Sequence, residues 1–232
     1  MLKIENTDVY GWEAAIRGMR NPMNSWEQSD SGFRCNDIPC EACPNLPERV
    51  LTEEGYKCDK QACAIGVKDF DLMQRLRKAG TDHRKFMRMI TVTCDVVAPL
   101  YWWKEFDTYK VGTVANSCST MHKIHAKEFT MDDFSHEHLM TGSMFQLHRT
   151  VDLLNEAREA YLDGDAKHKK AYWWQMIQLL PSSYNQRRTV LLNYEVLANI
   201  YKSRKHHKLD EWHTFCAWIE GLPYSELITG VE

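Results

Sequence analysis

Two amide side chains and a guanidinium group lie in the short, largely apolar segment NYEVLANIYKSR, as Asn193, Asn199 and Arg204. If the segment is one helix, eleven residues at about 100° each return to within roughly 20° of the start, so Asn193 and Arg204 share a face. Glu211 would extend the same face. A buried polar group without a partner costs about 1 to 3 kcal/mol, so each of these side chains needs a partner.

Two kinds of partner could satisfy these groups. Arg204 could pair with Glu211 or another acid while Asn193 caps a neighbouring backbone turn, a common structural use of such residues. Alternatively, a bound small molecule could complete their bonding. RKHHK, residues 204–208, offers a dense cationic corner that is either part of such a site or a solvated surface. Asn199 projects about 120° away from the other two, so a single helix does not explain it.

The composition is that of an ordinary globular protein. The chain has 232 residues, of which 44% are hydrophobic and 26% charged, enough for a sizeable core. Lys and Arg total 29 against 32 Asp and Glu, a net charge of -3, so we expect no nucleic-acid polymer as partner. The N-terminus has no apolar signal region, and the most apolar stretch is interrupted by Asp95. We therefore expect a cytoplasmic protein with no membrane partner.

Hydrophobic periodicity and breaker residues place the elements that must position these side chains. A β-branched alternating run predicts a strand over residues 89–97, and residues 101–123 have the small and polar composition of a working loop. A last helix or helix pair is expected to begin after PSSYNQRR, residues 181–188, with Ser183 as a plausible cap, and to extend past Trp212 to Gly221-Leu222-Pro223. Further helices are predicted over residues 9–20, 71–80, 143–162 and 169–180.

Five of the eight cysteines fall between residues 35 and 63, in an irregular insertion at about 33–66 of an otherwise single domain, 1–232. Without a secretion signal, reduced thiols are expected rather than disulfides. Four thiolates could hold a structural zinc or an iron-sulfur site that folds this core-poor segment, or the thiols could be unbound. The candidate metal ligands are Cys35, Cys40, Cys43, Cys58 and Cys63.

The segment LLPSSYNQRRTVLLNYEVLANIYKSRKHHKLDEW resembles the C-terminal segment of the flavin-dependent thymidylate synthases. That family has Leu-Pro, an Asn twelve residues after the Pro, a second Asn six further on and an Arg five beyond it. Pro181, Asn193, Asn199 and Arg204 keep each of these intervals. LMQRLRKAGTDHRKF, followed by a strand, Ala98-Pro99 and an aromatic segment, is also similar to the family's order of elements. The resemblance covers about residues 71–123 and 176–220.

The resemblance implies an α+β fold with long C-terminal helices and an antiparallel sheet, assembled as a homotetramer. It implies FAD reduced by NADPH, methylenetetrahydrofolate as carbon source, and a pyrimidine deoxynucleotide, dUMP, as acceptor. Asn193 and Asn199 would lie against the flavin, and Arg204 would contact the nucleotide. The basic turn of His83, Arg84 and Lys85 would supply flavin phosphate partners, unless it is simply an exposed turn.

The family's central motif, which begins with Arg-His-Arg, is represented here by TYKVGTVANSCSTMHK. Placing Asn116 and Ser119 on the family Asn and Ser puts Tyr109, Lys110 and Val111 on Arg-His-Arg. An ungapped count from Ala98-Pro99 instead puts Lys110 on the second Arg, Thr113 on the first Ser and Cys118 on the last. Under either register Lys110 and His122 are the available cations, and Lys lacks the bidentate fork of Arg.

Within this motif we expect Tyr109 to contact the cofactor, and Asn116, Ser117 and His122 to bind the nucleotide with Arg204. The candidate catalytic residues are Ser119, Cys118 and Lys110. The serines and the amide could instead form a tight turn, and the cysteine could simply pack.

The expected function is that of a flavin-dependent methyltransferase converting dUMP to dTMP. Because the altered motif weakens a direct transfer of dUMP specificity, a dCMP methylating or hydroxymethylating enzyme is an alternative. A third possibility, from another class, is a non-catalytic protein that binds a nucleotide or a partner on the same scaffold.

Overall fold

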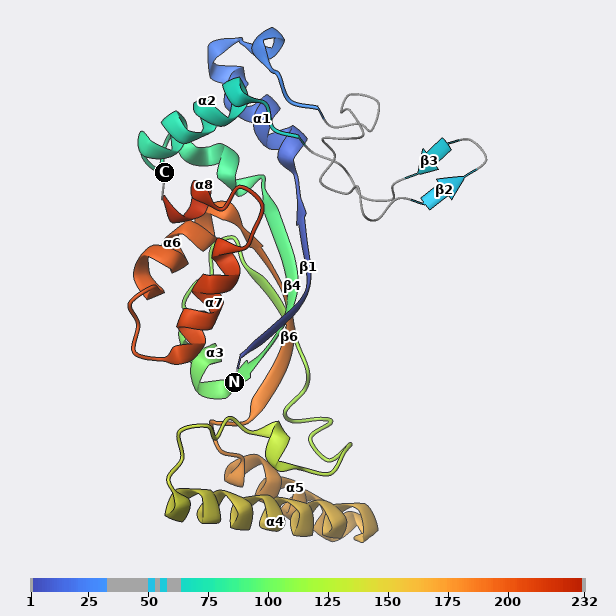
Figure 1. The fold of residues 1–232 in the computed structure, drawn as a ribbon. Helices are drawn as coiled ribbons and strands as arrows, with labels where there is room; N and C mark the ends of the chain where they lie inside the picture. Colours follow the sequence, from blue (N-terminus) through green and yellow to red (C-terminus); the bar gives the residue numbers. More distant parts are fainter. Residues whose placement is uncertain (1, 33–49, 53–54, 58–63, 231–232) are drawn as a thin grey trace. The chain divides into compact units, whose positions relative to one another are not determined.

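The chain divides into two compact units in the computed structural model, which describes residues 2–32, 50–52, 55–57 and 64–230 (Figure 1). Unit 1 contains Met1–Asp8, Thr93–Leu192 and Ser203–Gly221, and unit 2 contains Val9–Val92, Asn193–Lys202 and Leu222–Glu232. The single domain with an insertion at about 33–66 stays a prediction, because most of that insertion lies outside the described residues.

The elements have the following bounds. The strands are β1 (Lys3–Tyr10), β2 (Val50–Thr52), β3 (Gly55–Lys57), β4 (Thr91–Pro99), β5 (Val114–Ser117) and β6 (Asn185–Asn193). The α-helices are α1 (Trp12–Arg20), α2 (Val67–Lys78), α3 (Leu100–Phe106), α4 (Thr141–Asp163), α5 (Ala166–Leu179), α6 (Tyr194–Arg204), α7 (Asp210–Glu220) and α8 (Glu226–Thr229). The 3-10 turns are η1 (Asn21–Met23), η2 (Trp26–Gln28), η6 (Arg84–Arg88) and η7 (Met131–Asp133).

A four-stranded sheet in the order β1-β4-β6-β5 lies almost entirely in unit 1. Along β4 the burial alternates, with Val92, Cys94 and Val96 at most 1% exposed, because successive side chains of a strand point to opposite faces. The strand predicted over residues 89–97 is therefore confirmed. β5 pairs antiparallel with β6, from Val114 opposite Leu191 to Ser117 opposite Arg188. The α+β class with an antiparallel sheet is also confirmed.

In unit 1, α3 and α7 pack through large aromatic side chains. The Trp102 ring centroid lies 4.7 Å from that of Trp212 and 5.5 Å from that of Phe215. Trp102 and Phe106 are buried one helical turn apart on α3, which explains why this aromatic run is helical. The prediction of a loop over residues 101–123 is therefore wrong at its start, and wrong again where β5 forms.

The helices predicted over residues 143–162 and 169–180 are confirmed as α4 and α5, which lie side by side (Figure 1). Asp165 caps α5 by accepting a hydrogen bond from the backbone N–H of His168 at 3.0 Å. Their shared core is completed by the preceding loop and contains Ile124, Phe129, Phe134, Leu147, Val151, Leu154, Ala157 and Met176.

The C-terminal segment corrects the helix expected after residues 181–188. Residues 185–193 form β6, where Gln186, Val190 and Leu192 are buried at even spacing, the period of a strand. Asn193 therefore ends a strand, and Glu211 belongs to a separate helix, α7. The proposed polar stripe along one continuous helix is wrong. The C-terminal helices α6 and α7 have 11 residues each, while α4 is the longest described helix with 23.

Unit 2 is built on α1 and α2. The helix predicted over residues 9–20 begins only at Trp12, because Val9 and Tyr10 belong to β1. Gly11, with φ of 93°, forms the turn between β1 and α1. The Trp12 ring centroid lies 5.2 Å from that of Tyr194 and 5.2 Å from that of Tyr224, which joins α1 to the C-terminal part of the unit. The helix predicted over residues 71–80 is confirmed as α2, which begins earlier, at Val67.

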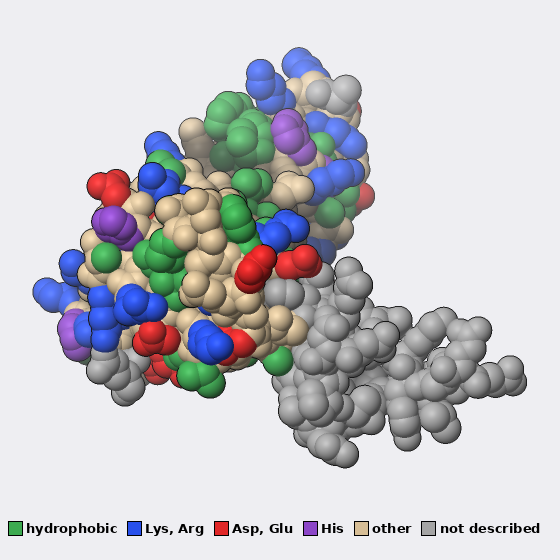
Figure 2. All heavy atoms as spheres, turned by 90° about the horizontal axis from the view of Figure 1, so that it is seen from above, with side chains coloured by type: hydrophobic (Ala, Val, Ile, Leu, Met, Phe, Trp, Pro, Cys, Tyr) green, Lys and Arg blue, Asp and Glu red, His purple; other side chains and the backbone are tan. Residues whose placement is uncertain are grey.

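In the part of the chain that the structure describes, no helix is both long and apolar enough to cross a bilayer. Figure 2 shows Lys and Arg side chains interspersed with Asp and Glu over the coloured residues of the near face. Surface charge on that face is mixed in sign, so a strongly cationic site would have to be local.

Candidate functional site

In unit 1, the guanidinium of Arg204 is held by three neighbours. Its Nε donates to Tyr109 Oη at 2.9 Å and its Nη1 donates to Glu105 Oε2 at 2.7 Å. The guanidinium carbon also lies 4.7 Å from the Trp212 ring centroid, a cation–π contact. With 17% of its side chain exposed, Arg204 is fixed in orientation but still reaches the surface.

Glu105 is the central acceptor of this cluster, and its position in the sequence alone did not identify it. Its Oε2 accepts from Arg204 and from Trp212 Nε1 at 2.8 Å, and His207 Nε2 lies 3.3 Å from the same oxygen. The available signal was an acid within the aromatic run YWWKEF, where burial of the neighbouring rings requires the carboxylate to find donors nearby. Arg204 thus pairs with an acid, but the acid is not Glu211, which accepts from Tyr101 Oη.

A pocket of about 200 Å³ lies beside Tyr109 in the same unit. Lys110 is its cation and Asp107 its carboxylate, the latter bound to Arg188 at 2.7 Å. Since Tyr109 both lines the pocket and accepts from Arg204, it connects the two features. The complete lining is Phe106, Asp107, Tyr109, Lys110, Thr113 and Ala115.

Residues 116–122, which follow the last pocket-lining residue in the sequence, do not line the pocket. They contain most of the predicted nucleotide-binding residues. Asn116 and Ser117 are exposed on β5, and His122 is exposed in the loop that follows. Ser119 Oγ accepts from the backbone N–H of His122 at 2.8 Å and from that of Met121 at 3.3 Å. The tight turn that we considered as an alternative role for this serine is therefore present.

Cys118 is an exposed free thiol, whereas Cys94 and Cys216 are buried. The backbone of Cys118 is fixed, because its N–H donates to the Arg187 carbonyl at 2.9 Å and its own carbonyl accepts from Gln186 Nε2 at 2.7 Å. Burial, followed by the charge of Asp95, raises the pKa of Cys94 to about 12. Of these three thiols, Cys118 is the one accessible to a reagent or substrate.

In unit 2, Asn193 and Asn199 have partners of their own. Asn193 Oδ1 accepts from the backbone N–H of Val196 at 2.9 Å and so caps α6. Asn199 Oδ1 accepts from Arg84 Nη2 at 3.1 Å. Arg84 Nε also donates to Glu195 at 3.3 Å. Arg204, Asn193 and Asn199 thus all have partners inside the chain, so the alternative of internal partners is confirmed and no ligand is required to satisfy them.

Glu195 is a second acid that the sequence alone did not identify, and it is buried. Burial acts to raise its pKa, but the hydrogen bonds and charges of Arg88 and Arg84 outweigh burial and hold the pKa below its ordinary value. The carboxylate, at the start of α6, therefore fixes Arg84 of the basic turn and also Arg88. His83 and Lys85 of the same turn are exposed.

Arg77, which lies near Arg84 in unit 2, is a cation that could bind the phosphate of a cofactor. Arg77 is half-buried, and its Nη1 donates a long hydrogen bond, 3.5 Å, to Gln74 Oε1. Burial and the nearby charge of Arg84 lower the pKa of Arg77, a mutual repulsion that a bound anion would relieve. Among the described residues Arg77 has no ion pair, so negative charge beside Arg77, Arg84 and Lys85 would be stabilised.

For metals, the described ranges hold no group of three or more His, Cys, Asp or Glu side chains arranged to bind an ion. The five cysteines predicted as ligands lie outside the described residues, so a zinc or iron-sulfur site there stays a prediction.

Comparison with known proteins gives a likeness in structure alone. No family model matches the sequence, and no curated protein matches it. A crystal structure of the flavin-dependent thymidylate synthase ThyX from Helicobacter pylori with FAD and dUMP aligns with a TM-score of 0.62 at 14% identity, covering 98% of this chain and 97% of that one. A second structure of ThyX from that organism with FAD and dUMP gives a TM-score of 0.61 at 14% identity, covering 99% and 97%. The chain therefore has the fold of these flavin-dependent thymidylate synthase structures, and at 14% identity the likeness is one of fold alone.

Proposed function

We propose that the chain is a flavin-dependent thymidylate synthase-like enzyme that transfers a one-carbon unit from methylenetetrahydrofolate to C5 of dUMP. The observation that carries the proposal is the fold, shared over almost the full length of two structures that hold FAD and dUMP. The intervals joining Pro181, Asn193, Asn199 and Arg204 support it further. The proposal includes NADPH as reductant, a homotetrameric assembly and a cytoplasmic location.

In this proposal the flavin phosphates are held by Arg84, Lys85 and His83, with Arg77 beside them. Asn193 Oδ1 caps α6 and Asn199 Oδ1 binds Arg84, while neither Nδ2 group donates to an acceptor among the described residues, so in this proposal both amides offer a donor to the cofactor. Tyr109 would also contact the cofactor. FAD supplies the redox chemistry when bound, and the protein supplies binding and orientation.

Arg204 is the proposed contact for the pyrimidine nucleotide. Two of its nitrogens are fixed by Glu105 and Tyr109, which leaves the Nη2 group, bound to no acceptor among the described residues, to donate to a ligand. Such a preoriented donor loses little conformational freedom on binding. Further binding groups would be Asn116, Ser117 and His122.

Lys110, Cys118 and Ser119 are the proposed catalytic residues. Lys110 places a single cation in the pocket beside Tyr109, where it could neutralise a phosphate without the fork of an arginine. Ser119 Oγ accepts two backbone N–H groups, so its hydroxyl hydrogen remains available to donate. The exposed Cys118 thiol is the accessible nucleophile.

The first experiment is the absorption spectrum of the purified protein, which should show bound flavin. Tritium release from C5-labelled dUMP should then depend on NADPH and methylenetetrahydrofolate, and labelled dCMP provides the test of the alternative acceptor. Arg204→Ala should abolish nucleotide binding and leave flavin absorption intact. Arg149→Ala, which removes an exposed ion pair of 3.6 Å with Glu156, is the control. Retained nucleotide affinity in Arg204→Ala would refute the role given to it.

One observation favours a second candidate, a protein that binds a nucleotide without catalysis. Glu105 already neutralises Arg204, and Lys110 and His122 are the cations available in the region that resembles the family's Arg-His-Arg motif. A protein that binds flavin and dUMP but releases no tritium from either labelled nucleotide would support this candidate over the enzyme.

A further inference from the structure

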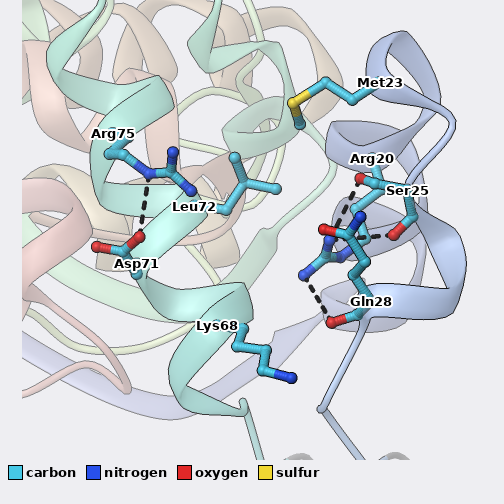
Figure 3. Close-up of a pocket in the computed structure, with 8 residues that line it drawn as sticks. All are labelled: Arg20, Met23, Ser25, Gln28, Lys68, Asp71, Leu72 and Arg75. Carbon is cyan, nitrogen blue, oxygen red and sulfur yellow. Dashed lines mark hydrogen bonds and ion pairs between the residues drawn. The ribbon is translucent and has the colours of Figure 1, made fainter.

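Unit 2 contains a pocket of about 410 Å³ that plays no part in the function proposed above (Figure 3). One wall comes from α1 and the turns that follow it, and the other comes from α2. Its lining consists of Arg20, Met23, Ser25, Gln28, Lys68, Asp71, Leu72 and Arg75. Three of these side chains are cations and one is a carboxylate, in a chain whose net charge is -3.

The inner wall is a rigid cationic group. Arg20 is only 3% exposed; its Nε donates to Asp69 at 2.6 Å, its Nη1 to the Ser25 carbonyl at 3.1 Å and to Ser25 Oγ at 3.3 Å, and its Nη2 to the Gln28 carbonyl at 3.2 Å. These bonds use four of the five N–H groups of a guanidinium. The fifth, on Nη2, has no acceptor among the described residues, and Arg20 borders the pocket.

Asp69 holds Arg20 in place from behind the pocket. Its Oδ2 accepts from Ser29 Oγ at 2.6 Å, from Ser31 Oγ at 2.6 Å and from the backbone N–H of Asp30 at 3.2 Å. Burial acts to raise the pKa of Asp69, but these hydrogen bonds and the charge of Arg20 outweigh it and lower the pKa. The acid is therefore ionised and committed to its donors, and the remaining donor of Arg20 is fixed in direction.

The outer wall adds mobile positive charge. Lys68 and Arg75 lie seven residues apart on α2 and so project from one face of the helix. Figure 3 shows Lys68 extending from α2 toward the segment that carries Arg20 and Gln28. Arg75 pairs with Asp71 at 3.0 Å on the surface, a contact of little net energy, whereas Lys68 has no ion pair in the described part of the chain.

The pocket also has an apolar side, formed by Met23 and Leu72. Leu72 is 5% exposed and fixed, while Met23 is 49% exposed and its flexible thioether side chain can adapt to a flat aromatic ring. The volume is in the range that accepts a small organic ligand. We propose that this pocket binds a small phosphorylated aromatic compound, with the phosphate on Arg20, Lys68 and Arg75 and the ring against Met23 and Leu72.

Isothermal titration of the full chain with phenyl phosphate, first without dUMP and then with saturating dUMP, tests the proposal. Phenyl phosphate should bind at one site per chain and more tightly than inorganic phosphate, because the ring adds apolar contact. Lys68→Ala and Arg75→Ala should each weaken phenyl phosphate about tenfold, the usual effect of losing one charged hydrogen bond.

Arg17→Ala is the matched control. Arg17 forms an exposed pair with Glu13 four residues away, as Arg75 does with Asp71, but it does not line the pocket. Its affinity for phenyl phosphate should equal that of the wild type. The proposal is overturned by an absence of saturable binding, by equal affinity for inorganic phosphate, by equal losses in all three variants, or by displacement of phenyl phosphate when dUMP is added.

Discussion

Replacing Glu105 by alanine tests whether the cluster around Arg204 is held by this one carboxylate. The change removes the acceptor of Arg204 Nη1 at 2.7 Å, of Trp212 Nε1 at 2.8 Å and of His207 Nε2 at 3.3 Å. A hydrogen bond to a charged group contributes about 1.5–3 kcal/mol. Because 34% of the Glu105 side chain is exposed, solvent screens part of this energy, and we expect a total loss of about 2 kcal/mol.

Urea unfolding followed by tryptophan fluorescence measures this loss. With an m-value of about 2.5 kcal/mol/M, the midpoint of Glu105→Ala should fall by about 0.8 M at unchanged slope. Glu105→Gln retains an oxygen acceptor of the same size without the charge, so it should lose about 1 kcal/mol. In a double-mutant cycle, Glu105→Ala combined with Arg204→Ala should lose less than the sum of the single variants, since each removes the same ion pair.

The control is Glu13→Gln, which removes an exposed pair with Arg17 at 3.8 Å and should change the free energy of unfolding by less than about 0.5 kcal/mol. If Glu105→Ala unfolds at the wild-type midpoint, or if the double-mutant cycle is additive, then the carboxylate does not hold Arg204. Preorientation of Arg204 for a nucleotide would then have no physical basis.

Three further outcomes are expected. The pKa of Asp69 in the folded state lies below its unfolded value of about 3.9, so its contribution to stability is present above that pH and is lost as pH falls through the folded pKa. Asp69→Asn should therefore remove this acid-dependent loss of stability, as measured by thermal unfolding between about pH 5 and 2. In the native protein iodoacetamide should alkylate Cys118 and spare Cys94, as peptide mass spectrometry would show; labelling of both at equal rates would contradict the burial of Cys94. Gly11→Ala should destabilise the protein by about 2 kcal/mol or more, since φ is 93° and a Cβ would lie 2.0 Å from the Met89 carbonyl oxygen. Gly142→Ala, in open space on α4, should instead stabilise it by about 0.5–1 kcal/mol. Equal urea midpoints for the two variants would refute this reasoning.

Some elements could be predicted because their signals are local. The alternation in β4 and the spacing of Val151, Leu154 and Ala157 on α4 each identify an element without knowledge of its neighbours. β1 was missed because its side chains are mostly exposed, so the strand has no apolar alternation to detect. α3 was missed because an aromatic run beside a small-residue loop fits a loop as well as a helix until its packing partner is known.

The functional clusters were less predictable, since they depend on pairings over long sequence separations. Glu105 contacts Arg204 across 99 residues and Arg84 contacts Glu195 across 111 residues. Sequence spacing shows which residues share an element but not which elements meet, so both acids escaped notice. The partner suggested by spacing, Glu211, binds Tyr101 instead.

The interval between Asn193 and Arg204 is set by the length of one helix rather than by a shared face. Asn193 ends β6 and caps α6, and Arg204 is the last residue of α6, so eleven helical residues follow the cap. At the N-terminus the amide satisfies a backbone N–H, and at the C-terminus a cation interacts favourably with the helix dipole. Each residue therefore has a structural reason for its position that requires no ligand. A functional role for either must accordingly be measured by ligand affinity, because stability alone would change in both variants whether or not a nucleotide binds.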